Sequence, residues 1–327
     1  MQILKLIAVF ALVAISGCTN MQRLAHVYCG QALNPTTYRY QDGGTSLYYS
    51  FTINGGSEPD TYVFFYGGSG CASWKYVMPD YVDGLSVHAR VFALNKRFVT
   101  DRSTGMFDCG KDFHLANNPD QWISDYSEFI LEQLNAAPSK PNTVVLVGVS
   151  EGALTAAKVA GLRPEITHIA TIGEGGYPMR KSLSILKQKG AISFDVESGW
   201  KEISSDPHSI EKRWYGNTYR WWSDVMDIDP ASHFLALNIP ILIGIGEKDE
   251  SVPVESALYL KSKFQEAAKS NLTLKVYPGA DHRLDDNGVS YRSEFFSELN
   301  RLLQSPHTSK QPIAHDQIVT QEDSQPQ

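Results

Sequence analysis

The sequence predicts an α/β protein in which helices flank a mainly parallel sheet, with a helical cap inserted late in the chain. From about residue 45, extended apolar runs alternate with segments whose apolar residues recur at helical spacing, which is typical of βα units. Between residues 178 and 236 this alternation stops, and aromatic residues become frequent. The composition fits one globular domain, because 42% of the residues are hydrophobic and 20% are charged.

Seven apolar runs have the length and composition of strands. They are Ser46 to Ile53, Thr61 to Tyr66, Ala89 to Leu94, Thr143 to Val147, Ile166 to Ile172, Ile239 to Ile245 and Leu272 to Tyr277. Apolar residues at three- and four-residue spacing predict a helix from Trp122 to Leu134 and a last helix from Val289 to Leu303. We expect the globular domain to span residues 18–304 and to include the cap insertion at 178–236.

The first eighteen residues have the features of an export signal. Lys5 precedes an uninterrupted apolar run from Leu6 to Ile15, which Ser16, Gly17 and Cys18 follow. The run is too short for a permanent membrane-spanning helix, which needs roughly 20 apolar residues. Residues 1–17 are therefore predicted to be a signal peptide. Ordinary cleavage near Gly17, with an incidental cysteine, is the alternative.

The stretch from Ile15 to Cys18 resembles the lipobox of bacterial lipoproteins. This resemblance implies that Cys18 becomes the lipidated first residue and that its acyl chains tether the domain to a membrane. Thr19 follows the cysteine, and lipoproteins without Asp at that place resemble those sorted to the outer membrane, facing the periplasm. After Gln304 the chain turns polar, so residues 305–327 are predicted to be a mobile tail.

Charge and residue spacing exclude two classes of partner. The formal net charge of the chain is −7, and no run of Lys or Arg forms a basic stripe, so nucleic acid is not expected to bind. The sequence has no CxxC, HExxH or clustered His and Cys spacing, so we expect no metal site.

The motif Gly148-Val149-Ser150-Glu151-Gly152 lies between a predicted strand and an alanine-rich segment that favours a helix. This context matters, because GxSxG alone arises by chance in roughly one chain of this length in ten. Small residues at both ends permit a sharp strand-to-helix turn with Ser150 exposed at its apex. Ser150 is the predicted nucleophile, and an inert serine in a glycine-rich turn is the alternative.

A serine hydroxyl is a weak nucleophile near neutral pH, so it needs a base and an acid that orients the base. Asp249 and His282 each follow a predicted strand later in the chain, and they are the candidates for the acid and the base. Glu247, Glu250 and Asp281 also carry carboxylates close by, and they remain alternatives for the acid.

The loop from Tyr66 to Gly70 follows a predicted strand and contains three glycines. It resembles the HGGG-type loop of esterases, with Tyr66 in the position of the histidine. The resemblance implies that the N–H of Gly68 or Ser69, together with that of Glu151, forms an oxyanion hole. A phosphate-binding turn is the alternative, but no Lys-Ser/Thr follows the glycines.

From about residue 61 to residue 282 the chain resembles the α/β-hydrolase superfamily in the order of nucleophile, acid and base. The resemblance implies the α/β-hydrolase fold and a serine hydrolase that needs no cofactor. Glu151 stands where prolyl-oligopeptidase-like peptidases are expected to have a bulky aromatic residue. We therefore expect a carboxylic ester or thioester of a small molecule or acyl compound as substrate. A serine peptidase of the same fold, and an inert lipoprotein that binds an envelope partner, are the alternatives.

Three further cysteines, Cys29, Cys71 and Cys109, would face an oxidising compartment after export. In the superfamily, the strands that precede Cys71 and Cys109 are neighbours, which implies that both residues lie near the carboxyl edge of the sheet. We expect a disulfide between these two. Pairing of either with Cys29, or three reduced thiols, remains open.

Overall fold

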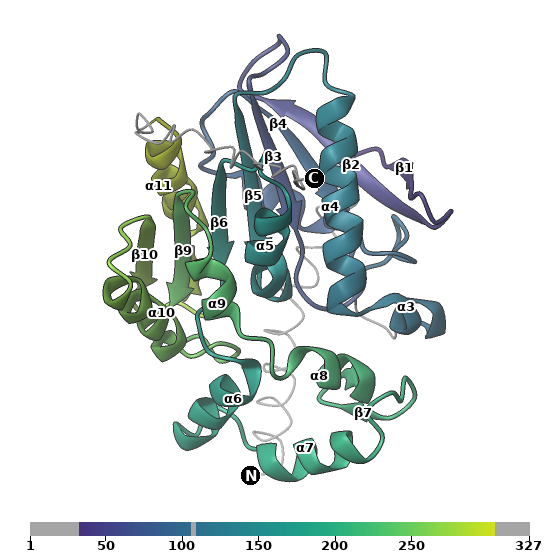
Figure 1. Ribbon diagram of the computed structural model, residues 1–327, viewed down its shortest axis with the longest axis vertical. Helices are drawn as coiled ribbons and strands as arrows, with labels where there is room; N and C mark the ends of the chain where they lie inside the picture. The colour runs from purple at the N-terminus through teal and green to yellow at the C-terminus, as the bar shows by residue number, and fades with distance from the viewer. Residues whose placement is uncertain (1–32, 106–108, 305–327) are drawn as a thin grey trace, which may run out of the picture.

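The computed structural model of the protein describes residues 33–105 and 109–304. An eight-stranded sheet forms its centre, with helices on both faces (Figure 1). The strands lie side by side in the order β1 (Thr36–Arg39), β2 (Thr45–Ile53), β4 (Ala89–Leu94), β3 (Thr61–Tyr66), β5 (Thr143–Val149), β6 (His168–Ile172), β9 (Ile241–Gly246) and β10 (Leu272–Tyr277). The predicted α/β class with a mainly parallel sheet is confirmed.

Strand β2 pairs antiparallel with both β1 and β4, and the pairs from β4 through to β10 are all parallel. The sequence did not reveal β1. Of its four residues only Tyr38 is buried, so β1 lacks the apolar alternation that identifies a longer strand.

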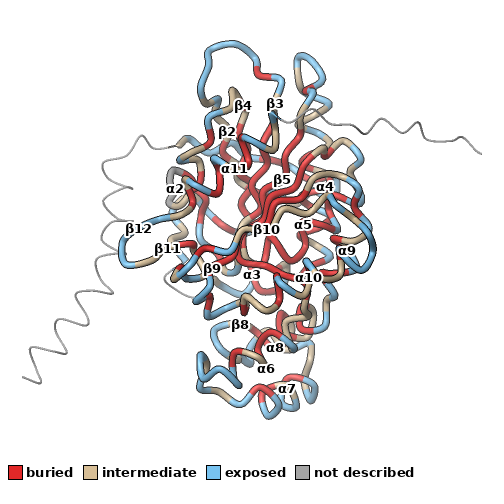
Figure 2. The backbone as a smooth tube through the Cα atoms, turned by 90° about the vertical axis from the view of Figure 1, so that its left-hand side faces the viewer, coloured by how far each residue is buried: buried red, intermediate tan, exposed pale blue. Residues whose placement is uncertain are grey.

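Both faces of the central strands are buried, so their sequences read as continuous apolar runs. Alternate residues enter two separate cores: Phe64 packs on one face of the sheet, whereas Phe65 packs on the other. The buried strands run through the middle of the molecule in Figure 2.

The first core is covered by α4 (Pro119–Asn135), α5 (Glu151–Leu162), α10 (Val254–Glu266) and the segment between β6 and β9. The second core is covered by the 3-10 helix η1 (Trp74–Tyr76), α2 (Met78–Val82) and α11 (Arg292–Gln304). A further helix, α3 (Lys111–Ala116), lies before α4. Helix α4 includes the predicted Trp122–Leu134 segment and starts earlier, where Asn118 caps the N–H of Gln121.

The segment between β6 and β9, where the sequence suggests a cap, contains four helices and a short hairpin. They are α6 (Met179–Gln188), α7 (Val196–Ser205), β7 (Arg213–Trp214), β8 (Asn217–Thr218), α8 (Tyr219–Val225) and α9 (Pro230–Leu235). Helix α9 packs on α5, whereas α6, α7 and α8 stand beyond the end of the sheet (Figure 1).

The last predicted helix begins later than the sequence suggests. Val289 and Ser290 are not helical but form β12 (Val289–Ser290), which pairs with β11 (Asp285–Asp286) across the turn Asn287-Gly288. Both turn residues have positive φ, as an Asn-Gly hairpin turn requires. The Asn-Gly pair was the sequence signal for this hairpin.

Several predictions lie outside the described residues. These are the signal peptide at 1–17, lipidation of Cys18 and the tail at 305–327. Cys29, the other disulfide partner that the sequence left open, also lies outside them. None of the helices within residues 33–105 and 109–304 combines the length and the apolar character needed to cross a bilayer.

Candidate active site

Ser150 lies at the apex of the turn from β5 into α5, with φ of 54° and ψ of −119°. The glycines on either side permit this turn because they let the backbone of neighbouring elements come very close. A Cβ at Gly148 would lie 2.8 Å from the Cα of Ala153, and one at Gly152 would overlap the carbonyl oxygen of Tyr66. The two glycines of the sequence motif are therefore required where β5 meets α5 and β3.

Ser150, His282 and Asp249 form one hydrogen-bonded chain. The Oγ of Ser150 lies 2.9 Å from Nε2 of His282, and Nδ1 of the same ring lies 2.8 Å from Oδ2 of Asp249. Asp249 is buried, and its Oδ1 accepts the N–H groups of Ser251 and Val252 at 2.8 Å each. A carboxylate held in this way keeps the imidazole proton on Nδ1, so that Nε2 can accept the serine proton.

Packing between the turns after β9 and β10 sets the distance from acid to base. The N–H of Lys248 donates to the carbonyl oxygen of Ala280 at 2.9 Å. A Cβ at Gly246 would overlap that same oxygen, so glycine lets the two turns come together. The side chains of Asp249 and His282 consequently meet at the carboxyl edge of the sheet.

The three carboxylates that the sequence left open as the acid have other partners or face solvent. Glu247 and Glu250 are exposed, and Glu247 accepts the N–H of Gly279 at 3.0 Å. Asp281 is also exposed and accepts the N–H of Arg283 at 2.8 Å. Asp249 alone among these carboxylates is hydrogen-bonded to His282.

The glycine-rich loop after β3 lies against the nucleophile. A Cβ on Gly68 would be 3.3 Å from the Cβ of Ser150 and 3.9 Å from its Oγ. Ser69 lines the same cavity as Ser150. Glu151 is the first residue of α5, so its N–H has no acceptor within the helix. The three residues predicted for the oxyanion hole therefore surround the serine.

Tyr126 on α4 lies behind this loop and is fully buried among aromatic side chains. Its ring stacks on that of Tyr66 with 3.7 Å between centroids, and its hydroxyl donates to the carbonyl oxygen of Leu94 at 2.5 Å. Burial raises the pKa of Tyr126, and hydrogen bonds from the Trp74 indole and the N–H of Gly67 oppose that rise. Tyr126 thus supports the start of the loop.

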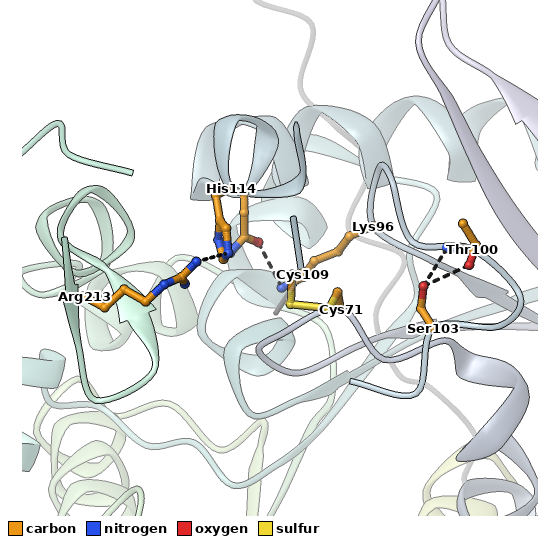
Figure 3. The surroundings of a disulfide bond; sticks show 8 residues. Cys71, Lys96, Thr100, Ser103, Cys109, His114 and Arg213 are labelled. Carbon is orange, nitrogen blue, oxygen red and sulfur yellow. Dashed lines mark hydrogen bonds between the residues drawn. A yellow bond between two sulfur atoms is a disulfide. The ribbon is translucent and has the colours of Figure 1, made fainter. Parts of the chain in front are cut away.

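A disulfide joins the other end of the loop to the segment before α3, as the sequence predicted. The Cα atoms of Cys71 and Cys109 are 5.5 Å apart. Figure 3 shows this bridge and, close by, the contact between His114 on α3 and Arg213 on β7, whose nitrogens are 2.9 Å apart. One covalent and one polar contact thus lead from the loop through α3 to the inserted segment.

A cavity of about 210 Å³ opens beside Ser150 and His282. The loop 67–70 lines it, and Trp74, Val77 and Tyr81 are among its apolar lining residues. None of the described residues that line it comes from 178–236, so the aromatic residues of that segment do not form its wall. Several of them pack on one another. Trp214 and Trp222, for example, contact each other with ring centroids 4.7 Å apart.

A buried ion pair lies directly beside the nucleophile, between Lys96 after β4 and Glu151. Trp221 on α8 donates its indole N–H to the second oxygen of Glu151 at 2.6 Å, and the Lys96 ammonium lies 4.2 Å from the centre of the Trp122 ring. Burial lowers the pKa of Lys96 well below its ordinary value, whereas the carboxylate of Glu151 favours its charged form.

Glu174 follows β6 at the same edge of the sheet and was not among the residues predicted from the sequence. It is 5% exposed, and its carboxyl accepts the N–H of Gly175 at 2.7 Å. Burial raises the pKa of Glu174 to about 8; the Gly175 N–H opposes this rise, and the charge of Asp249 adds to it. A Cβ at the preceding Gly173 would lie 2.7 Å from Cε1 of His282, so Glu174 borders the triad.

The described residues contain no group of three or more His, Cys, Asp or Glu side chains placed to hold a metal ion. The geometry instead has the parts that acyl transfer requires: a serine, a base hydrogen-bonded to it, a buried acid behind the base, and backbone N–H groups nearby.

The model of the prolyl oligopeptidase family, peptidase family S9, matches residues 102–300 of this chain. No curated protein sequence matches it. The family match corrects the argument drawn from Glu151, because a glutamate after the nucleophile does not place the chain outside this family.

Solved structures with a similar fold include esterases and a peptidase. Est1E from Butyrivibrio proteoclasticus with ferulic acid bound has a TM-score of 0.58 and 17% identity, covering 81% of this chain and 98% of that one. The esterase Pf2001 of Pyrococcus furiosus has a TM-score of 0.57 and 17% identity, with coverages of 83% and 90%. The acylaminoacyl peptidase of Pyrococcus horikoshii has a TM-score of 0.55 and 12% identity, with coverages of 85% and 42%. These likenesses confirm the α/β-hydrolase fold.

Proposed function

Because this chain belongs to the prolyl oligopeptidase family of hydrolases, we propose that it cleaves a carboxylic ester or thioester through an acyl-enzyme formed at Ser150. The observation that carries the proposal is the hydrogen-bonded chain from Ser150 through His282 to Asp249, beside a cavity of about 210 Å³. A small cavity suits a compact acyl or aryl group. The esterases of similar fold also support this choice.

In the proposed reaction, the Oγ of Ser150 attacks the carbonyl carbon while its proton passes to Nε2 of His282. The charge that develops on the carbonyl oxygen is stabilised by the N–H groups of Gly68 or Ser69 and of Glu151. His282 then gives the proton to the departing alcohol or thiol, and the bond between this group and the acyl carbon breaks.

Water completes the cycle. His282 removes a proton from a water molecule, whose oxygen attacks the acyl carbon and displaces the serine oxygen. His282 returns the proton to Ser150 as the acid is released. Asp249 stays ionised throughout and stabilises the imidazolium that forms in each half of the reaction.

A fluorophosphonate probe tests the nucleophile. The folded wild type should be labelled, and Ser150→Ala should not. No labelling of the wild type, or equal labelling of both proteins, would contradict the proposal and favour an inert scaffold that binds an envelope partner.

A serine peptidase is the second candidate, because the family model and the acylaminoacyl peptidase neighbour both point to it. Matched esters, thioesters and aminoacyl amides with one acyl group separate the two. The ester proposal predicts the higher kcat/KM for the ester or thioester. A higher value for the amide, after allowance for its lower intrinsic reactivity, would favour the peptidase.

We also propose that the protein is a lipoprotein, anchored through Cys18 to the outer membrane and facing the periplasm. The support is the apolar segment from Leu6 to Ile15 followed by Ser16-Gly17-Cys18. Metabolic labelling with a fatty acid should mark the wild type but not Cys18→Ala. Equal incorporation into both proteins would refute lipidation at this residue.

A further inference from the structure

The cavity beside Ser150 carries positive charge, although the whole chain has a formal net charge of −7. Lys96 and Arg283 line it, and no Asp or Glu is among the described residues of its wall. Lys96 is neutralised by its buried ion pair with Glu151. Arg283 is therefore the cationic residue of this wall whose charge no described ion pair balances.

Hydrogen bonds hold the backbone of Arg283, whereas its side chain has no partner among the described residues. Its N–H donates to Asp281 and its carbonyl oxygen accepts from Arg292 at 2.7 Å. Its guanidinium makes no hydrogen bond, ion pair or ring contact with any residue in the described part of the chain, whereas those of Arg97 and Arg180 pair with carboxylates at 2.8 and 2.7 Å. A guanidinium with unpartnered donors, on a partly buried residue whose backbone is fixed, can bind a planar anion.

The position of Arg283 indicates which part of the substrate it would meet. In the proposed reaction His282 gives its proton to the leaving group, so the leaving portion must lie beside His282. Arg283 is the next residue and lines the same cavity. We therefore expect its charge to act on the alcohol or thiol portion of the substrate.

We propose that Arg283 binds a carboxylate on the leaving portion of the substrate, so that the preferred substrates are acyl esters or thioesters of hydroxy acids or mercapto acids. This inference rests on the proposed ester hydrolysis. Because a hydrogen bond between two charged partners contributes more than a neutral one, its loss should lower kcat/KM by about ten- to a hundredfold.

The test compares 4-carboxyphenyl acetate with 4-carbamoylphenyl acetate, which has a neutral amide in place of the carboxylate. Arg283→Gln should lower kcat/KM for the first ester about ten- to a hundredfold and leave that for the second within about twofold. Arg283→Lys should keep part of the preference. Arg39→Gln removes an exposed arginine on the edge strand β1 and should change neither value.

Each other outcome overturns the inference. An unchanged ratio in Arg283→Gln would show that the guanidinium does not bind the carboxylate. Equal losses on both esters would mean that the substitution acts through His282. A second pair, phenyl hydrogen adipate and phenyl hexanoate, puts the carboxylate on the acyl portion; dependence on Arg283 for this pair alone would contradict the placement.

Failure of the proposed function has a different signature. In that case the wild type would hydrolyse none of the four esters and would not react with a fluorophosphonate, and the inference about Arg283 would fall with it. Hydrolysis of all four esters with no dependence on Arg283 would leave the proposed function intact and overturn only the carboxylate site.

Discussion

The backbone of Ser150 has a conformation that residues with side chains rarely adopt. Such conformations cost of order 1–3 kcal/mol and persist only where the surroundings hold them. The N–H of Ser150 donates to the carbonyl oxygen of Ile172 at 2.8 Å, and its own carbonyl oxygen accepts from Ala153 at 2.8 Å and Leu154 at 3.1 Å. Both peptide groups are thus fixed, and the side chain projects at the apex.

Replacing Ser150 by glycine should therefore give a more stable protein than replacing it by alanine. Glycine adopts positive φ without the clash of a Cβ, and this gain of about 1–2 kcal/mol exceeds the entropy that glycine adds to the unfolded chain. Urea unfolding of the two variants, both without a nucleophile, measures the difference. A Ser150→Ala protein as stable as Ser150→Gly would show that the turn is not strained.

Glu174 should make the fold less stable as the pH rises. Burial raises its pKa to about 8 from an ordinary value of 4.5, so between these values the folded protein holds a proton that the unfolded chain releases. The free energy of unfolding then falls by at most roughly 1.4 kcal/mol per pH unit across this window. Asp249 and His282 lie at the same edge and would also affect the pH dependence of activity. Stability therefore reports the titration of Glu174 more directly than activity does.

Glu174→Gln removes this titration and should therefore stabilise the protein, relative to the wild type, more at pH 8 than at pH 5. Urea unfolding at both pH values gives the two differences. Glu250→Gln, a change at an exposed carboxyl, serves as the control and should show no such increase. If Glu174→Gln raised the free energy of unfolding equally at both pH values, or more at pH 5, this would contradict a raised pKa for Glu174.

At the scale of elements, the ion pair of Lys96 and Glu151 joins three segments. Lys96 follows β4, Glu151 begins α5, and the indole of Trp221 brings α8 onto the same carboxylate. The helix behind the nucleophile is thereby tied both to the sheet and to the inserted segment.

Removing one partner of this pair leaves the other charge buried, so Lys96→Met and Glu151→Gln should each lower the free energy of unfolding by about 3–5 kcal/mol. The double variant should lose less than the sum, because neither charge is then left alone. Chemical unfolding of all four proteins gives the coupling free energy. Additive losses would show that the two side chains do not interact.

The elements that the sequence predicted well are the longer strands of the central sheet. From β3 to β9, apolar runs identified each buried parallel strand to within two residues at either end, and β10 was predicted although Thr and Lys interrupt its apolar residues. Polar residues after β9 and β10 gave the residues proposed as acid and base. The short β1 and the hairpin of β11 and β12 expose most of their side chains and depend on backbone pairing, which leaves little apolar pattern to detect.

Side-chain partners far apart in the chain could not be predicted in the same way. Lys96 and Glu151 are separated by 55 positions, and nothing in their local sequence distinguishes them from solvated charges. Glu174 did have a usable signal, since it follows β6 at the edge where the other site residues gather. What the sequence did not contain was the packing that buries its carboxyl.

At the scale of the whole molecule, the disulfide closes a long loop around the active-site wall. Cys71 and Cys109 are 38 positions apart, and a bridge of this span disfavours the unfolded chain by ~4 kcal/mol in the chain-entropy model. The glycine-rich loop ends at one cysteine, and the other leads through α3 to the contact of His114 with Arg213 (Figure 3).

A protein with Cys71→Ser and Cys109→Ser should therefore unfold at lower urea concentration, with a loss of up to ~4 kcal/mol. Reductant should lower the stability of the wild type by a similar amount and leave the double variant unaffected. If reductant destabilised both proteins equally, or if the double variant matched the oxidised wild type, the bridge would not contribute in this way.

Because the residues of the candidate active site are far apart in the chain, the site can be completed only late in synthesis. Ser150 and His282, the proposed base, are 132 positions apart, and β10, which precedes His282, lies at the edge of the described sheet beside β9. A growing chain that ends before residue 282 lacks the group that is proposed to take the serine proton. We therefore expect Ser150 to react with a fluorophosphonate only after β10 has joined the sheet, so that this reaction would report completion of the domain.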